Sequence, residues 1–197
     1  MESFNNALFL WLNAPAHPNA IVLTAAIAIA QYLIWIIPVF IVTGWLRGAA
    51  NTRRLVFVAA VSGAIGLLIN QAIALLWWHP RPFMIPLGHT FLVHAPDSSF
   101  PSDHLTFWWA VAFCVLAQGR RRLGILLAVS GLPIAWARIY VGVHFPLDMV
   151  GAAFVAVAST WISLRIKKWY LPLIFPFAIK VHRKLFGKLI TIGWIRD

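Results

Sequence analysis

The sequence predicts an all-α integral membrane protein: a helical bundle of five to six transmembrane helices with an N-terminal interfacial helix and an amphipathic C-terminal tail. Two observations lead to this prediction. Of the 197 residues, 61% are hydrophobic and 11% are charged, whereas soluble domains contain about 45–50% apolar and about 25% charged residues. Long apolar runs also alternate with short basic clusters. The composition excludes a soluble globular domain, a disordered chain and, with Cys114 as the single cysteine, a disulfide scaffold.

Five apolar runs approach or exceed the length of about 20 residues that a membrane span needs. In order, they cover residues 20–46, 55–78, 102–118, 123–141 and 146–164. Basic residues follow the first, third and fifth runs, at 47–54, 120–122 and 165–168. Two prolines, Pro80 and Pro82, stop the second run. Pro146 opens the fifth run, and proline is favoured in a first helical turn.

The two ends of the chain differ from this central region. Within residues 1–19, the stretch 2–14 is too short to span a bilayer, and we interpret it as an interfacial helix on the outer face. Residues 20–168 form the transmembrane core in this division. Residues 169–197 mix aromatic and basic side chains, which predicts an amphipathic tail on the inner face. A sixth span requires that this tail fold back through the membrane.

The net charge of +11 is distributed unevenly along the chain. Because the basic residues lie in clusters between apolar runs, the pattern indicates cytoplasmic loops and not a nucleic-acid surface. In a five-span arrangement, residues 1–19, 79–101 and 138–146 then lie on the opposite side. Arg81 and Arg138 are the basic residues that fall on that outer side, where positive charge is disfavoured.

Most of the other titratable residues fall on the same outer side. They are Asp97, Asp103, Asp148, His79, His89, His94, His104 and His144. Ionisable groups at the edge of the hydrocarbon are costly, which makes them candidates for a functional site. His94 and Asp97 either shape the loop before the third span or contact a distal phosphate, and we favour the loop role.

The spacing of these residues indicates phosphate chemistry. Asp148 lies four residues after His144, about one helical turn, so its carboxylate can fix one imidazole nitrogen and leave the other as a nucleophile. Ser102 and His104 open the third span, and a helix N-terminus favours phosphate. A simple helix-capping role also fits Ser102, and a favourable interaction with the helix dipole fits Asp103. Two arginine forks suit phosphate oxygens.

Metal binding is the alternative chemistry for the same groups. His104 and His144, with Asp103 or Asp148, offer ligands for a divalent ion. The sequence contains neither an H-x-x-x-H nor an H-E-x-x-H spacing. Two arginines beside the histidines suit an oxyanion better than a cation, so we predict no metal site.

Three segments together resemble the motifs of the type-2 phosphatidic acid phosphatase family, which are K-x6-RP, PSGH and SR-x5-H-x3-D. The corresponding residues are Ala74-x6-Arg81-Pro82, Pro101-Ser102-Asp103-His104 and Ala137-Arg138-x5-His144-x3-Asp148. Three positions depart from the family: Ala74 replaces lysine, Ala137 replaces serine and Asp103 replaces glycine. The aspartate, with the strings HPRPF and DSSFPSDH, resembles the bacitracin-resistance branch of undecaprenyl pyrophosphate phosphatases.

The resemblance implies a role for each site residue. His144 would be the nucleophile, Asp148 would orient it, and His104 would protonate the leaving oxygen and then activate water. Arg81, Arg138 and Ser102 would hold the phosphate oxygens. Asp103, Pro82 and His79 are further candidates, with His79 a substitute for the missing lysine. No cofactor or metal is implied.

The branch also implies a substrate and a place in the cell. The substrate would be C55 isoprenyl pyrophosphate, hydrolysed on the outer face of the bacterial cytoplasmic membrane to recycle the cell-wall lipid carrier and confer bacitracin resistance. The other expected partners are membrane lipids, and no nucleic-acid partner is expected. The motifs equally allow a phosphatase acting on phosphatidate or phosphatidylglycerol phosphate, or a lipid phosphotransferase. A transporter or channel is disfavoured because the polar groups gather at one face instead of crossing the bilayer.

Overall fold

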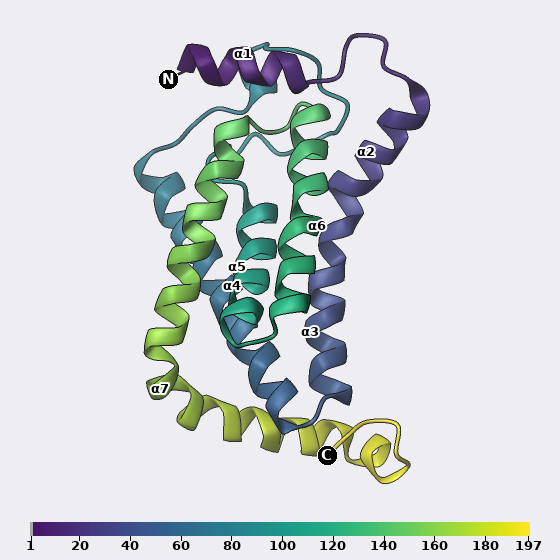
Figure 1. Ribbon diagram of the computed structural model, residues 1–197, viewed down its shortest axis with the longest axis vertical. Helices are drawn as coiled ribbons and strands as arrows, with labels where there is room; N and C mark the ends of the chain where they lie inside the picture. The colour runs from purple at the N-terminus through teal and green to yellow at the C-terminus, as the bar shows by residue number, and fades with distance from the viewer. Residues whose placement is uncertain (1) are drawn as a thin grey trace.

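The computed structural model describes residues 2–197 and is helical throughout its regular structure (Figure 1). Its elements are α1 (Glu2–Leu12), α2 (Ala20–Tyr32), η1 (Leu33–Trp35), α3 (Ile36–Arg47), α4 (Ala50–Leu76), η2 (Pro82–Met84), α5 (Asp103–Ala117), α6 (Arg121–Tyr140) and α7 (Pro146–Thr191). This confirms the predicted all-α bundle.

Among residues 2–197, four helical stretches are long and apolar enough to cross a membrane. They are Ala20–Arg47, Ala50–Leu76, Arg121–Tyr140 and Pro146–Thr191. The first combines α2, η1 and α3 in one continuous rod, and the other three are α4, α6 and α7. These correspond to the first, second, fourth and fifth of the predicted apolar runs.

The third predicted run forms α5, which is shorter than a membrane span. Its 15 residues give a length of about 22 Å at about 1.5 Å per residue, whereas the hydrocarbon core is about 30 Å thick. In Figure 1, α5 lies at the centre of the bundle, and it packs against α4, α6 and α7. Because these helices surround it, α5 contacts protein where a span would contact lipid.

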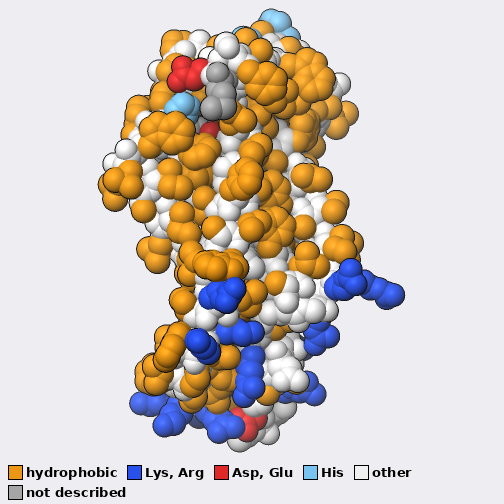
Figure 2. Space-filling model, turned by 60° about the vertical axis from the view of Figure 1, so that its left-hand side comes forward, with side chains coloured by type: hydrophobic (Ala, Val, Ile, Leu, Met, Phe, Trp, Pro, Cys, Tyr) orange, Lys and Arg blue, Asp and Glu red, His pale blue; other side chains and the backbone are white. Residues whose placement is uncertain are grey.

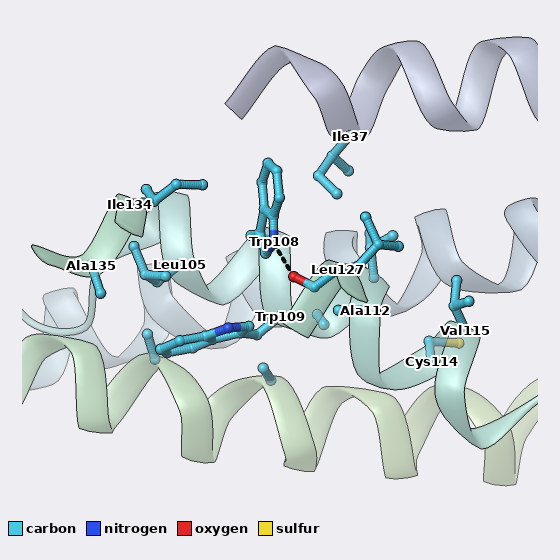
Figure 3. Packing of buried hydrophobic residues seen from close by; sticks show 14 of the residues in the cluster. Ile37, Leu105, Trp108, Trp109, Ala112, Cys114, Val115, Leu127, Ile134 and Ala135 are labelled. Carbon is cyan, nitrogen blue, oxygen red and sulfur yellow. Dashed lines mark hydrogen bonds between the residues drawn. The ribbon is translucent and has the colours of Figure 1, made fainter. Parts of the chain in front are cut away.

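Two tryptophans of α5 anchor it in the core (Figure 3). The indole Nε1 of Trp108 donates to the carbonyl of Leu127 at 2.6 Å, and that of Trp109 donates to the carbonyl of Ala128 at 3.0 Å. Both acceptors belong to α6. Large aromatic surfaces are therefore buried without leaving an indole N–H unpaired, a condition that buried tryptophan normally meets.

The N-terminal helix α1 lies across one end of the bundle (Figure 1). It is docked through buried residues: the Asn5 side chain accepts from the backbone N–H of Leu147 at 3.1 Å, and the Phe9 and Phe145 rings lie 5.3 Å apart. These contacts attach α1 to the start of α7.

The opposite end is crossed by the second half of α7, which bends near the base of the bundle in Figure 1. Pro172 and Pro176 lie inside this helix, and proline removes a helical hydrogen bond and produces a kink. In the described chain, the tail runs across the bundle and does not fold back along it as a sixth span. The division of the chain at residues 19 and 168 stays a prediction, since residue 168 falls inside α7.

A buried arginine holds the tail against the base. Arg53 of α4 donates to the carbonyls of Trp45 and Arg196, and its Nη2 lies 3.2 Å from Nε2 of His182 in α7. The backbone N–H of Arg196 also donates to the carbonyl of Leu46 at 3.1 Å. Arg53 thereby links the α3–α4 junction to the end of the chain.

The two ends of the molecule differ in charge. Figure 2 shows lysine and arginine side chains gathered at the lower end, and histidine side chains at the upper end, near α1. The middle of the visible surface is largely apolar. This arrangement is typical of a protein whose middle lies in lipid, with one strongly basic end.

Candidate active site

The residues of the three motifs meet at the end of the bundle near α1. They are Arg81 in the loop after α4, Ser102 and His104 at the start of α5, Arg138 in the last turn of α6, and His144 and Asp148 at the turn into α7. A backbone hydrogen bond of 3.3 Å from Ser102 to the carbonyl of Asp148 ties the α5 start to α7. Positions up to 67 residues apart in sequence thus form one site.

His144 and Asp148 form a buried pair. Nδ1 of His144 lies 3.1 Å from Oδ2 of Asp148, and each side chain is only 1% exposed. The same Oδ2 accepts from the backbone N–H of Phe145 at 2.8 Å, which caps the first turn of α7. The helix start therefore fixes the carboxylate, and the carboxylate fixes the imidazole.

Two guanidinium groups contact the other nitrogen of His144. Nη1 of Arg81 lies 3.0 Å from Nε2, and Nη2 of Arg138 lies 3.2 Å from it. Arginine can only donate, so Nε2 must accept and the imidazole proton resides on Nδ1, toward Asp148. The lone pair of Nε2 is thus directed toward two positive charges.

Backbone carbonyls hold both arginines in place. Arg81 donates to the carbonyl of Val143 at 2.8 Å, and Arg138 donates to the carbonyl of Ala30 at 3.2 Å. Both arginines are buried. Their placement gives a physical reason for positive charge on the predicted outer side, because each guanidinium is bound inside the protein and is not left at a lipid surface.

Three buried polar atoms at the site have no hydrogen-bond partner among residues 2–197: the donors Oγ of Ser102 and Nε of Arg138, and the acceptor Oδ1 of Asp148. An unpaired buried donor is costly and calls for an explanation. The two donors lie beside a positively charged cradle, which is the combination that an incoming oxyanion satisfies.

His104 occupies the first turn of α5 and is partly exposed. Within the described chain, no hydrogen bond engages its side chain. A charge on His104 would act on His144, as those of Arg138, Arg81 and His94 do, so the two histidines share one space. Burial, followed by the positive charge of Arg138, lowers the pKa of His104 to about 3 in the free protein. The negative charge of a bound phosphate acts in the opposite direction and favours the protonated imidazole.

The environment keeps His144 neutral. Burial, followed by the positive charges of Arg138 and Arg81, holds the pKa of His144 well below its usual value of 6.5. A neutral imidazole retains the lone pair that a nucleophile needs.

The three additional candidates occupy different places. The Asp103 carboxylate accepts from the amide of Asn70 at 2.7 Å. Pro82 is buried and starts η2 directly after Arg81. The His79 ring packs against Trp77 and Phe145, with centroids 5.8 and 5.9 Å away. Of the three, Pro82 adjoins a guanidinium, whereas the described contacts of His79 and Asp103 lie outside the arginine cradle.

The structure adds residues that the motifs did not single out. Oγ of Ser99 donates to Oδ2 of Asp148 at 2.5 Å and is buried. Asp97 accepts from Nε of Arg81 at 2.8 Å, and Nε2 of His94 lies 3.2 Å from Nη2 of Arg138. These residues precede the second motif, and no spacing rule signals them. For Asp97 and His94, the sequence signal was a titratable side chain on the predicted outer side, whereas Ser99 gave no signal.

The arrangement combines a nucleophilic nitrogen, an oxyanion cradle and a second histidine able to transfer a proton. That set matches phosphoryl transfer, in which positioning and charge stabilisation dominate. Among residues 2–197, no group of three or more histidine, cysteine or acidic side chains is placed to hold a metal ion.

Comparisons with known proteins agree with this chemistry. The chain is 35% identical to YbjG of Escherichia coli (strain K12), with all of both chains covered. It is 31% identical to the undecaprenyl-diphosphatase BcrC of Bacillus subtilis (strain 168), over 94% of this chain and 95% of the relative.

A solved structure shows the same fold. The transmembrane PAP2 type phosphatidylglycerolphosphate phosphatase from Bacillus subtilis superposes with a TM-score of 0.61, covering 85% of this chain and 86% of that one at 17% identity. With its four long apolar helices, this chain is a multi-pass membrane protein. Because the family model matches residues 51–172, more than half of the sequence, the chain belongs to the PAP2 superfamily.

Proposed function

We propose that this protein is an undecaprenyl-diphosphatase, which hydrolyses the terminal phosphate of the C55 isoprenyl diphosphate through a phosphohistidine intermediate. BcrC carries that name, and YbjG carries it provisionally, and both relatives align over nearly the whole chain. The observation that carries the mechanism is the Nε2 atom of His144, held 3.0 and 3.2 Å from two buried guanidinium nitrogens.

In the first step, Nε2 of His144 attacks the terminal phosphorus. The N–P bond forms as the bond from phosphorus to the bridging oxygen breaks, and His104 donates a proton to that oxygen. Arg81, Arg138 and Ser102 stabilise the charge on the transferring group, the kind of interaction that contributes most to catalysis. Asp148 stabilises the positive charge that develops on His144.

In the second step, water replaces the histidine. His104, now neutral, takes a proton from the water as its oxygen bonds to phosphorus, and the N–P bond breaks. The products are orthophosphate and undecaprenyl phosphate. The neutral His104 left by the first step is the base that the second step needs, so one residue serves both.

The setting we propose is the bacterial cytoplasmic membrane, with the site facing the periplasm or cell exterior. The basic end of the molecule supports this orientation by the positive-inside rule. There the reaction returns the lipid carrier of cell-wall precursors to use, the activity expected of a bacitracin-resistance enzyme.

The test is phosphate release by the purified protein in detergent with EDTA. C55 isoprenyl diphosphate is compared with phosphatidate and phosphatidylglycerol phosphate. His144→Ala is run beside His89→Ala, an exposed histidine of the loop before α5. We expect preferential release from the isoprenyl diphosphate, lost in His144→Ala and retained in His89→Ala. Activity that requires a divalent ion, or that survives in His144→Ala, would overturn the mechanism.

A further inference from the structure

A third histidine lies beside the cradle and has no part in the mechanism above. His94 belongs to the loop between η2 and α5. Its ring centroid is 6.3 Å from that of His144, and its Nε2 lies 3.2 Å from Nη2 of Arg138. The same Arg138 nitrogen lies 3.2 Å from Nε2 of His144. The two imidazoles therefore converge on a single guanidinium nitrogen.

The hydrogen bonds of His94 define which nitrogen faces the cradle. Nδ1 lies 3.1 Å from the carbonyl of Ala95 and 3.6 Å from Oδ1 of Asp97. A carbonyl only accepts, so Nδ1 carries the proton. Nε2 consequently accepts from Arg138, as Nε2 of His144 does. His94 thus presents Nε2 to Arg138 as His144 does, while Asp97, whose Oδ1 accepts from Nε of Arg81, lies nearby as a negative charge.

The two histidines differ in depth. The side chain of His144 is 1% exposed, whereas that of His94 is 21% exposed. In-line phosphoryl transfer places the leaving group opposite the nucleophile. Because His144 is buried, the leaving group of the substrate lies on the more exposed side of the site, and His94 is the more exposed of the two histidines. For a diphosphate, that leaving group is the second phosphate.

We propose that His94 binds the second phosphate of the substrate, the one that stays on the lipid, and so sets the preference for diphosphates over monophosphates. This inference rests on the proposed function. A monophosphate fills only the cradle formed by Arg81, Arg138 and Ser102. A diphosphate extends to His94 and gains a further charge-assisted hydrogen bond.

The charges around His94 support this role. In the free protein, burial, with Arg81 and Arg138, lowers the pKa of His94, while the Ala95 carbonyl and Asp97 act in the opposite direction. The other titratable groups that act on this space are His104, His144, Asp103 and Asp148. A bound phosphate neutralises the two guanidinium groups and leaves Asp97 to favour the imidazolium. Nε2 of His94 then takes up a proton from solvent and donates a hydrogen bond to a phosphate oxygen.

The experiment compares two competitive inhibitors of isoprenyl diphosphate hydrolysis. Methylenediphosphonate carries both phosphate groups and resists hydrolysis, whereas orthophosphate fills the cradle alone. Loss of one hydrogen bond to a charged group corresponds to about a tenfold change in affinity. In His94→Ala we expect the inhibition constant of methylenediphosphonate to rise about tenfold and that of orthophosphate to stay within about twofold.

Two further variants complete the design. His94→Asn fits the loop but its shorter side chain does not extend as far as Nε2 of His94, so it must show the same selective loss. His89→Ala, in the same loop, must change neither constant. Equal weakening of both inhibitors in the two His94 variants, or no change, would overturn the inference. A wild-type protein that releases no phosphate from isoprenyl diphosphates would instead refute the proposed function.

Discussion

At the scale of single residues, the Asp148 carboxylate is the best-supported group of the site. Its Oδ2 accepts from Ser99, from Phe145 and from His144, at 2.5, 2.8 and 3.1 Å. Of these, the Ser99 contact comes from a loop that no motif includes. Because Oγ of Ser99 also lies 3.4 Å from Nδ1 of His144, we expect Ser99 to act as a positioning residue for the proposed nucleophile, chiefly through Asp148.

Replacing Ser99 tests that positioning role. Ser99→Ala removes a hydrogen bond to a charged group, which contributes about 1.5–3 kcal/mol, and loosens the aspartate that orients His144. We expect kcat to fall about 10- to 100-fold with KM little changed. Steady-state kinetics on the isoprenyl diphosphate measure both constants. Ser130→Ala, whose hydroxyl donates within α6 to the carbonyl of Leu127, is the matched control and should retain kcat. A wild-type kcat in Ser99→Ala would contradict the role.

The pH dependence of the reaction follows from the low pKa of His144. Because burial, Arg138 and Arg81 keep that pKa well below 6.5, His144 stays neutral and nucleophilic as the pH falls through 6.5. The acid limb of kcat/KM therefore lies below pH 6.5. A pH profile of the wild type and His89→Ala measures this. An acid limb of kcat/KM whose midpoint lies at pH 6.5 or above would contradict this prediction.

The motif residues could be predicted from sequence because their chemistry depends on local spacing. His144 and Asp148 are one helical turn apart, and Arg81 adjoins Pro82 in a sequence that stops a helix. Ser99, Asn70 and the orientation of His94 could not be predicted in this way. Each acts through a contact with a distant segment, such as the 2.7 Å hydrogen bond from Asn70 in α4 to Asp103 in α5.

At the scale of helices, the depth of the site depends on how closely α5 is held. An apolar run predicts a helix but gives no sign that its neighbours, and not lipid, surround it. The sequence therefore does not predict that α5 is short and central, and only the packing of the helices shows it. One close approach is decisive: a Cβ atom at Gly124 of α6 would lie 2.6 Å from the backbone Cα of Leu116 in α5.

A methyl group at this contact should force the two helices apart. Backbone atoms cannot rotate away, so we expect Gly124→Ala to cost about 1–3 kcal/mol of stability and to lower the melting temperature in detergent. Tryptophan fluorescence during heating measures this. Gly187→Ala in α7 is the matched control, since no atom lies within 4 Å of its Cβ position, and it should be neutral or stabilising. A Gly124→Ala melting temperature equal to the wild type would refute the close-packing argument.

At the scale of the whole molecule, the two ends carry different chemistry. The candidate catalytic groups lie at the end near α1, and the tail, fixed by Arg53, crosses the strongly basic end. The positions of the basic clusters in the sequence predicted which loops share a side, because that rule depends only on charge between apolar runs. The bend of α7 was less accessible to sequence reasoning, since Pro172 and Pro176 kink a helix that continues to Thr191.

The orientation in the membrane can be tested with single cysteines. The native Cys114 is buried and should give little background. Val93 is 100% exposed in the loop at the catalytic end, whereas Asp197 ends the chain at the basic end. In intact spheroplasts, a membrane-impermeant maleimide should label Val93→Cys and not Asp197→Cys. Both should be labelled once the membrane is permeabilised, which controls for reactivity. The reverse pattern in intact cells would place the catalytic groups in the cytoplasm and exclude recycling of the lipid carrier on the outer face.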